Sequence, residues 1–316
     1  GFNFIKSLEE NYEIIGIDSI NDAYDPKLKE LRLEELRKMS NFKFLKIDLS
    51  NQKELKSNEN ILSGTQTIFH LGARAGVRQS YLEPEKYILD NTTASVNLAL
   101  MAKNLGINNI ILASTSSIYG DTGNNFATEN KDELTEPPSI YAATKSFGET
   151  LIKNVLSEDD QLLKIGRFFT VYGPYGRPDM SILRFIHWVA TDQEVVIYGN
   201  GEQRRSFTYV MDIVDGLNKL KNYDKSDTFN FGSDTTWSLI EIINKIEERL
   251  EKKAKLIFKE RAFRDVDVVL PNLKKSEENL DWEPKVDIDE GLRRTIDWYK
   301  NYESYLSSIK FKYSYE

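Results

Sequence analysis

The strongest constraint on the fold is the way short apolar runs alternate with helical patterns in the first half of the chain. Several of these runs are apolar almost without interruption, as strands are when helices cover both faces of their sheet. This alternation predicts right-handed crossovers and a doubly wound parallel sheet, an α/β fold. The expected strands are residues 14–17, 42–47, 67–71, 109–113 and 162–169. The expected helices are residues 26–38, 84–105 and 139–156.

The pattern changes after about residue 170. A turn-rich segment over residues 172–178 leads to a helical stretch over 182–190, and mixed short strands and helices follow, including a helix over 239–250. We therefore expect two domains whose segments interleave. The first, residues 1–169, is a Rossmann-like nucleotide-binding domain, and the second, residues 170–316, is a smaller α/β domain that binds the substrate.

Composition excludes several classes of function. The chain has 42 Lys and Arg against 50 Asp and Glu, and a net charge of −8 argues against a nucleic acid partner. It has no cysteine and two histidines, His70 and His187, so a thiolate nucleophile and a multi-histidine metal site are excluded. No apolar run approaches the roughly 20 residues that a membrane helix needs, and we expect a soluble, cytoplasmic protein.

Two of three features of a dinucleotide-binding fold occur near the N-terminus. Such a fold needs a glycine loop after its first strand, a helix that faces the pyrophosphate, and an acid ending its second strand. Gly1 opens a helical stretch, and the strand that follows ends in Asp18. Asp18 would accept the ribose hydroxyls and favour NAD over NADP, or it is a turn residue. Because the first strand and two glycines are missing, we expect roughly ten more residues upstream in the natural protein.

The next two strand ends also carry candidate cofactor contacts. Asp48 follows the strand over residues 42–47 and could meet the adenine amino group, or it caps a helix or turn. The sequence His70-Leu71-Gly72-Ala73 ends the strand after that. Small residues there let the backbone approach a cofactor, although they also occur at tight strand ends.

A tyrosine and a lysine four residues apart are the candidate chemical centre. Tyr141 and Lys145 lie at the start of a predicted helix, and their spacing places both on one face. An ammonium beside a phenol stabilises the phenolate, as a tyrosine base near neutral pH requires. Such a pair is expected about once by chance in this chain. Here it follows a strand that ends in hydroxyls, and Thr115 could share a substrate hydroxyl with the tyrosine. Strand-end capping is the alternative for each hydroxyl alone.

Three segments together resemble the extended short-chain dehydrogenase/reductase family of nucleotide-sugar enzymes. They are Thr115 to Gly120, Tyr141-Ala142-Ala143-Thr144-Lys145, and Arg167-Phe168-Phe169-Thr170-Val171-Tyr172-Gly173-Pro174. Within that family, the chain is most similar to UDP-glucuronate 4-epimerases at Gly72-Ala73-Arg74-Ala75-Gly76-Val77-Arg78 and Tyr175-Gly176-Arg177-Pro178-Asp179-Met180. The resemblance extends from Gly1 to about Tyr299.

The resemblance implies an activity and a set of site residues. Tyr141, helped by Thr115 and Lys145, would take the proton of the sugar 4-hydroxyl while hydride passes from C4 to tightly held NAD. The 4-keto sugar would then turn over and receive hydride on its other face. The implied cofactor contacts are Gly1, Asp18, Asp48, Leu49, Leu71, Gly72, Ala73, Ser114, Tyr141, Lys145 and Phe168. The implied contacts to the UDP-sugar are Arg78, Asn91, Thr115, Ser116, Ser117, Thr170, Arg177, Tyr198 and Arg205.

The residues after Thr115 favour simple epimerisation. Family members that eliminate water carry Asp-Glu there, and those that decarboxylate carry Glu, whereas this chain has Ser116 and Ser117. By the same resemblance, these hydroxyls and Arg177 would hold the sugar carboxylate. A firm grip would keep the C–CO₂ bond out of alignment with the ring π system and so protect the β-keto acid intermediate. For Arg177, a loop arginine with a surface partner is the alternative.

Arg205 matches the arginine that clasps the diphosphate, for which a planar guanidinium is well suited. A solvated pair with Arg204 is the alternative. The chain departs from the family at Arg261-Ala262-Phe263-Arg264-Asp265, which replaces a Pro-Gly-Asp turn, and at Asn272, where Asp is common. Arg261 and Arg264 are therefore candidates for the second phosphate contact.

Other functions stay open at this point. One is 4-epimerisation of another UDP-sugar, such as UDP-glucose, a UDP-N-acetylhexosamine or an N-acetylated uronate. Another is a non-catalytic regulator that binds dinucleotide. Relatives usually form homodimers through a helical bundle, and residues 84–105 and 139–156 are the candidate helices. We expect a homodimer that serves polysaccharide biosynthesis.

Overall fold

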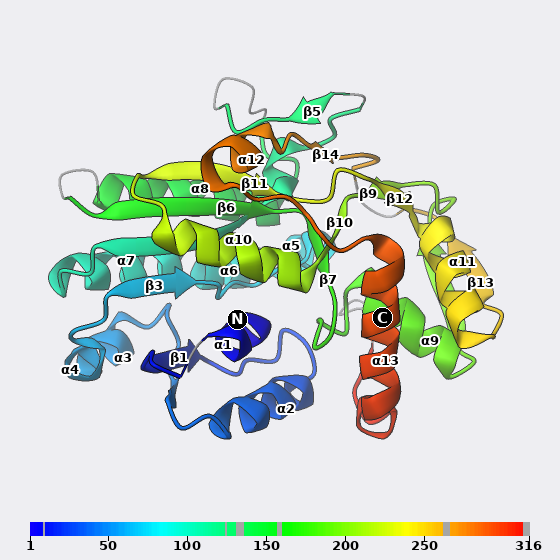
Figure 1. Ribbon diagram of the computed structural model, residues 1–316, viewed down its shortest axis with the longest axis horizontal. Helices are drawn as coiled ribbons and strands as arrows, with labels where there is room; N and C mark the ends of the chain where they lie inside the picture. Colours follow the sequence, from blue (N-terminus) through cyan, green and yellow to red (C-terminus); the bar gives the residue numbers. More distant parts are fainter. Residues whose placement is uncertain (9, 124, 131–135, 157–159, 262–265, 312–316) are drawn as a thin grey trace.

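A four-stranded parallel sheet lies at the centre of the computed structural model, which describes residues 1–8, 10–123, 125–130, 136–156, 160–261 and 266–311. Its strand order is β11-β6-β4-β3. A separate parallel pair joins β1 to β2 and lies beside the central sheet with helices α1 and α2 (Figure 1). These six strands are β1 (Ile14–Asp18), β2 (Phe42–Lys46), β3 (Thr67–His70), β4 (Asn109–Thr115), β6 (Leu162–Phe168) and β11 (Asp227–Phe231).

Helices and short strand pairs surround these sheets. The helices, in chain order, are α1 (Phe2–Ser7), α2 (Pro26–Arg37), α3 (Gln52–Ser57), α4 (Glu59–Leu62), α5 (Val77–Leu82), α6 (Pro84–Tyr87), α7 (Ala94–Asn104), α8 (Ile140–Val155), α9 (Ser181–Ala190), α10 (Val210–Asn222), α11 (Leu239–Leu250), α12 (Lys274–Leu280) and α13 (Ile288–Leu306). Two further turns are η1, a π-helix over Ile88–Thr93, and η2, a 3-10 helix over Ser116–Tyr119. The strand pairs are β5 (Phe126–Ala127) with β14 (Leu270–Pro271), β7 (Thr170–Tyr172) with β10 (Phe207–Tyr209), β8 (Glu194–Tyr198) with β13 (Lys255–Lys259), and β9 (Arg204–Arg205) with β12 (Trp237–Ser238).

Strand β4 shows why the sheet is doubly wound. Its successive side chains point to opposite faces, and Ile110, Ile111 and Leu112 are all buried. Ile110 and Leu112 pack in a cluster with residues of α7 and α8. Ile111 packs with residues of α10 on the other face. The apolar run over this strand is therefore explained by helices on both sides, and the expected α/β fold is confirmed.

One expected helix is broken. The periodicity over residues 84–105 predicts a single helix, whereas the structure has α6, the π-helical turn η1 and then α7. Within η1, Asp90 forms an ion pair with Arg74 at 2.7 Å, and the Asn91 amide binds the Arg74 backbone. A π turn inserts a residue without changing which residues are apolar, so the sequence pattern does not reveal it.

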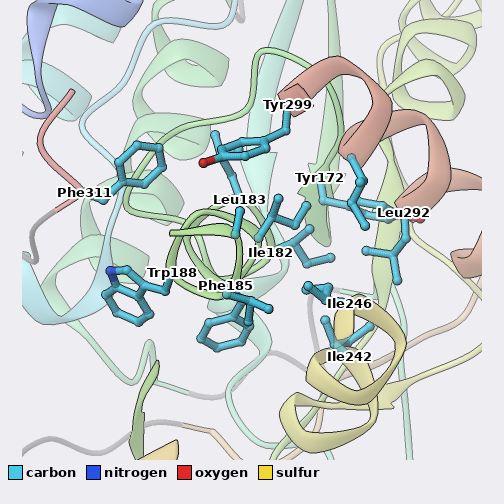
Figure 2. Packing of buried hydrophobic residues seen from close by; sticks show 14 of the residues in the cluster. Tyr172, Ile182, Leu183, Phe185, Trp188, Ile242, Ile246, Leu292, Tyr299 and Phe311 are labelled. Carbon is cyan, nitrogen blue, oxygen red and sulfur yellow. The ribbon is translucent and has the colours of Figure 1, made fainter. Parts of the chain in front are cut away.

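A second core forms around α9, whose residues from Ile182 to Ala190 are all buried. Figure 2 shows its side chains radiating toward Ile242 and Ile246 of α11 and toward Leu292 and Tyr299 of α13. A helix that is buried on every side must be enclosed by other elements. In this molecule α11, α13 and the β8–β13 pair enclose it (Figure 1).

The last turn of α13 and the segment after it return to α2. The backbone N–H of Lys310 donates to the Asp25 carboxylate at 2.9 Å, and the Tyr305 hydroxyl donates to a carbonyl in the first turn of the same helix. Phe311 stacks on His187 of α9 with ring centroids 3.8 Å apart. The segment therefore fastens α2 to both α9 and α13.

No helix in the described ranges combines the length and apolar character that a membrane span requires. The cytoplasmic location stays a prediction, and so does the division into domains at residues 169 and 170.

Gly291 lets α13 approach β7 closely, and this contact gives a test of the packing. A Cβ at Gly291 would stand 1.9 Å from the hydroxyl oxygen of buried Tyr172. Alanine favours a helix interior by about 1 kcal/mol over glycine. We nevertheless expect Gly291→Ala to lower the free energy of unfolding, measured with denaturant, by about 1–2 kcal/mol. The steric clash with Tyr172 should cost more free energy than the better helix propensity of alanine contributes. The same change in a Tyr172→Phe background should cost less. An equal cost in both backgrounds would contradict the assigned contact.

Candidate active site

The Thr115 hydroxyl lies beside the Tyr141 phenol at the carboxyl end of β4, close enough to act on its pKa. Thr115 is the last residue of the strand, and its hydroxyl also accepts from the backbone N–H of Ser117 at 3.1 Å, which turns the chain into η2. Burial raises the pKa of the Tyr141 phenol, while the neighbouring Thr115 hydroxyl and the Arg177 charge act to lower it. The structure thus brings together the hydroxyl and the phenol that the sequence singled out.

Helix α8 places Tyr141 and Lys145 on one face. The helix begins where the Ser139 hydroxyl accepts from the backbone N–H of Ala142 at 3.1 Å, an N-cap that fixes the first turn. The Lys145 side chain is buried, and burial lowers its pKa to about 8, against an opposing effect of the Glu149 carboxylate. An ammonium with this pKa is still charged at neutral pH and can stabilise a nearby phenolate.

A buried ion pair stands behind this centre. Arg167, in β6, donates to Glu149 of α8 through Nη2 at 2.8 Å and Nε at 3.1 Å. The Ser114 hydroxyl of β4 donates to the same carboxylate. A third nitrogen of Arg167 donates to the Tyr119 hydroxyl at 3.0 Å. One carboxylate therefore joins α8 to the ends of both central strands.

A polar cavity of about 450 Å³ lies beyond the ends of β1 and β2. It is lined by Ser19, Asn21, Lys46, Asp48, Glu54, Arg74 and Asp90. Asp18, the last residue of β1, has a half-exposed side chain that accepts from the backbone N–H of Ile20 at 2.7 Å. Asp48 accepts from the backbone and hydroxyl of Ser50, so it forms a turn and also lines the cavity. Both roles that the sequence left open for Asp48 are therefore compatible.

Small, exposed residues at this end of the sheet leave room for a dinucleotide. Gly72 and Ala73 are exposed where β3 ends, and a Cβ at Gly72 would have Leu49 within 4 Å, at 3.7 Å. Backbone can therefore approach a bound molecule here. Gly1 caps α1, and its carbonyl accepts from Ile5 at 2.9 Å. Leu71 follows the last residue of β3, and Phe168 ends β6 with its ring 6.0 Å from that of Phe231.

Arg177 lies on the loop between β7 and α9. Its Nε donates to Asp179 at 3.0 Å, and an Nη donates to the Ala75 carbonyl at 3.1 Å. It lines a small cavity with Thr170, the first residue of β7. Arg177 is therefore paired within its own loop, and it also reaches the segment that follows β3. Ser116 and Ser117 begin η2 and are partly exposed.

The residues expected at the nucleotide end of the substrate lie in two groups. The Arg78 guanidinium stands over the Tyr198 ring at 4.4 Å, so these two are brought together. Arg205 donates to the carbonyls of Arg204 and Asp267. Arg261 forms an ion pair with Asp267 at 2.6 Å, and the other phosphate candidate, Arg264, lies outside the described residues.

Asn91 is buried, and its partners come from the protein itself. Its amide oxygen accepts from the Arg74 N–H at 2.7 Å, and its amide nitrogen donates to the Arg74 carbonyl and to the Thr144 hydroxyl. These contacts hold the segment after β3 against α8. The substrate contact expected for Asn91 stays a prediction.

Sequence reasoning missed the roles of Arg74 and Glu149. Glu149 lies four residues after Lys145, and Arg167 is a charged residue inside an apolar strand. A buried charge needs a partner, so Glu149 and Arg167 could have been predicted to form a buried ion pair. Arg74 gave no comparable signal, because the partners that hold it, Asp90 and Glu83, belong to segments whose packing the sequence does not reveal.

Comparison with known proteins agrees with this geometry. The family model described as GDP-mannose 4,6 dehydratase matches residues 1–295. A UDP-glucuronate 4-epimerase of Thermodesulfobacterium geofontis is 40% identical over 304 residues, which cover 96% of this chain and 93% of the relative. The chain named protein CapI of Staphylococcus aureus is 34% identical, with 94% of each chain covered.

Solved structures give the same result. The UDP-glucuronic acid 4-epimerase of Bacillus cereus, in complex with UDP-glucuronic acid and NAD, superposes with a TM-score of 0.88 at 29% identity, covering 95% of this chain and 96% of that chain. The UDP-N-acetylglucosamine 4-epimerase of Methanobrevibacter ruminantium M1, in complex with UDP-N-acetylmuramic acid, superposes with a TM-score of 0.84 at 27% identity. The match covers 95% of this chain and 94% of that chain. The resemblance read from the sequence is confirmed, and this chain belongs to the GDP-mannose 4,6 dehydratase family.

Proposed function

We propose that this chain is an NAD-dependent isomerase that interconverts UDP-glucuronate and UDP-galacturonate at C4. The observation that carries the proposal is the placement of the Thr115 hydroxyl beside the Tyr141 phenol, one helical turn from buried Lys145. The 40% identical UDP-glucuronate 4-epimerase supports the choice of substrate, as does the structural similarity to a relative that binds UDP-glucuronic acid and NAD.

Asp18, Asp48, Gly72 and Lys145 are the residues that would hold NAD. Bound there, NAD supplies a hydride acceptor for the first half of the reaction and a hydride donor for the second. The carboxylate of Asp18 suits ribose hydroxyls, and a 2′-phosphate beside it would be repelled. Tight binding lets one cofactor serve successive turnovers without exchange.

Tyr141 moves the proton in both directions. As a phenolate it accepts the proton of the sugar 4-hydroxyl, and as a phenol it returns that proton once the keto group is reduced. Burial alone raises the pKa of the phenol, so the base form needs positive charge nearby. Arg177 provides such a charge, and Lys145 on the same helix face would add a second, while Thr115 would orient the shared hydroxyl.

The carboxylate of the sugar would be held by Arg177 together with the hydroxyls of Thr115, Ser116, Ser117 and Thr170. Arg177 and Thr170 line one cavity, which supports this grouping. No carboxylic acid occupies positions 116 and 117, so a leaving hydroxyl has no proton donor there. Arg78, Tyr198, Arg205 and Asn91 would bind the nucleotide portion, with the Tyr198 ring against the uracil.

We also propose that the chain forms a homodimer through the faces of α5, η1 and α8. These neighbouring elements expose an apolar patch made of Tyr81, Leu82, Ile88, Leu89 and Phe147. Monomeric proteins seldom leave side chains of this size together in water. Two of the contributing elements lie within the residues that the sequence suggested for a dimer, 84–105 and 139–156.

To test this function, purified protein is incubated with UDP-glucuronate without added NAD. NMR then follows the conversion of the sugar nucleotide. We expect UDP-galacturonate to form. Tyr141→Phe should lose about a thousandfold in rate, because general acid–base catalysis contributes about 10²–10⁴-fold. UDP-glucose and UDP-N-acetylglucosamine serve as parallel substrates. Faster conversion of either one, or no effect of Tyr141→Phe, would contradict the proposal.

The pH dependence tests the role of Lys145. Its ammonium is intact below a pH of about 8 and is lost as the pH rises through that value, so kcat/KM should fall above it. The Glu149 carboxylate raises the pKa of Lys145, so Glu149→Gln should shift this fall to lower pH. Glu149→Asp keeps the negative charge, so the fall in kcat/KM should return to about the pH at which it occurs in the native protein. If kcat/KM falls at the same pH in the native protein and in both Glu149 variants, the Lys145 ammonium does not cause this fall. Thermal unfolding of each variant checks that buried Arg167 is still accommodated.

The dimer proposal is tested by placing one charge in the patch. We expect Phe147→Glu to produce a monomer in sedimentation equilibrium, because an unpaired carboxylate buried in an apolar interface is costly. Phe258→Glu is the matched control, since Phe147 and Phe258 are both 54% exposed and Phe258 lies on β13. A native protein that is already a monomer, or dissociation by both variants, would contradict the assigned face.

A further inference from the structure

The loop that carries Arg177 is held by an arginine of another part of the fold. This loop spans residues 173–180, between β7 and α9. Arg32 of α2 reaches it and donates through one nitrogen, Nη2, to the carbonyls of Tyr175 at 2.7 Å and Gly176 at 3.0 Å. The two acceptors are the carbonyls of the residues directly before Arg177. Helix α2 follows β1, the strand that ends in Asp18, so the contact joins the cofactor side of the molecule to the loop.

The opposite side of the loop is packed against aromatic rings. Tyr175 adopts a φ of +58°, in the left-handed region, and its ring lies 5.0 Å from that of Trp298 and 4.2 Å from that of Phe2. Its hydroxyl donates to the Tyr302 hydroxyl at 2.8 Å. A non-glycine residue in this conformation is held there by its surroundings. The ring contacts fix the side chain, and Arg32 fixes the carbonyl.

Arg32 and Arg177 both stand against the ring of Tyr24. The guanidinium carbons of Arg32 and Arg177 lie 5.5 and 5.6 Å from the centroid of the Tyr24 ring. Another nitrogen of Arg32 donates to the Tyr24 hydroxyl. The ring that Arg177 stands over is therefore itself fixed by Arg32. Backbone and ring contacts both lead from Arg32 to the position of Arg177.

We propose that Arg32 is a positioning residue for recognition of the sugar carboxylate: by holding the carbonyls of Tyr175 and Gly176 and the ring of Tyr24, it places the Arg177 guanidinium. This inference rests on the proposed function. A planar guanidinium with several N–H groups can bind the two carbonyls and a hydroxyl at once. A lysine has one nitrogen at its tip and cannot reach all three with the same geometry.

Calorimetric titrations with UDP-glucuronate, UDP-glucose and UDP separate this role from general stabilisation. We expect Arg32→Met to weaken UDP-glucuronate about tenfold, because charge-assisted hydrogen bonds that fix the loop are lost. UDP-glucose and UDP lack the carboxylate, so their Kd values should change less than about twofold. Arg37→Met, an exposed arginine on the same helix, is the matched control and should change none of them. Equal weakening of all three ligands by Arg32→Met would overturn the proposal.

A double-mutant cycle decides whether Arg32 acts through Arg177. In an Arg177→Gln background the sugar carboxylate has lost its arginine, so Arg32→Met should weaken UDP-glucuronate by less than about twofold more. A full further tenfold loss would show that Arg32 acts independently and would overturn the proposal. Arg32→Lys keeps the charge and should give the same selective loss at reduced size. If Arg32→Met does not fold, the Arg32→Lys variant takes its place in both experiments. Thermal unfolding shows whether each variant is folded.

The two proposals fail in different ways. If the native protein binds UDP-glucuronate no more tightly than UDP-glucose and does not convert it, the proposed substrate is wrong. If the native protein converts UDP-glucuronate but the Arg32 and Arg177 effects multiply, the proposed function stands and the positioning role of Arg32 is wrong.

Discussion

The pairing of Glu149 with Arg167 is the interaction on which the arrangement of the catalytic groups depends. Their side chains are about 10% and 3% exposed, so both charges are removed from water and each needs the other. Through this pair, α8 is fixed against β6, and through Ser114 it is fixed against β4. Tyr141 and Lys145 lie on α8 and Thr115 ends β4. Tyr141 and Thr115 therefore meet at a junction that the buried charges define.

A second theme is that charged groups of the loops are satisfied by neighbours from distant segments. Arg74 is held by Asp90 and, through its backbone, by Asn91. Arg177 is held by Asp179 and reaches the Ala75 carbonyl. These contacts give the loops beyond the strand ends a defined shape, which a site needs in order to recognise its ligand without a large ordering cost. They also leave most of the polar groups at the sheet edge tied to the protein framework.

The sequence predicts the parallel strands well, because helices on both faces impose long apolar runs such as Ile110 to Leu112. It also predicts that Thr115 and Tyr141 meet, because Thr115 ends a strand at the carboxyl edge of the sheet and Tyr141 lies at the start of a helix that follows in the α/β alternation. The π-helical turn over Ile88–Thr93 was missed because it leaves the apolar pattern unchanged. Glu149 and Arg74 were missed because their partners come from other segments. The assignments of Asn91, Tyr198 and Arg205 rest on resemblance, and they stay predictions.

The segment from Tyr305 to Phe311 has a consequence for how the molecule can open. Because it joins α2 to α9 and α13, a hinge between the β1–β2 side and the α9–α13 side would have to break either its contact to Asp25 or its stacking on His187. Release of product through such a hinge would therefore be slow unless α2 travels together with α13. A local movement of the loops at the sheet edge would leave both halves of the molecule in place, but it would have to release contacts such as those from Arg32 to the carbonyls of Tyr175 and Gly176.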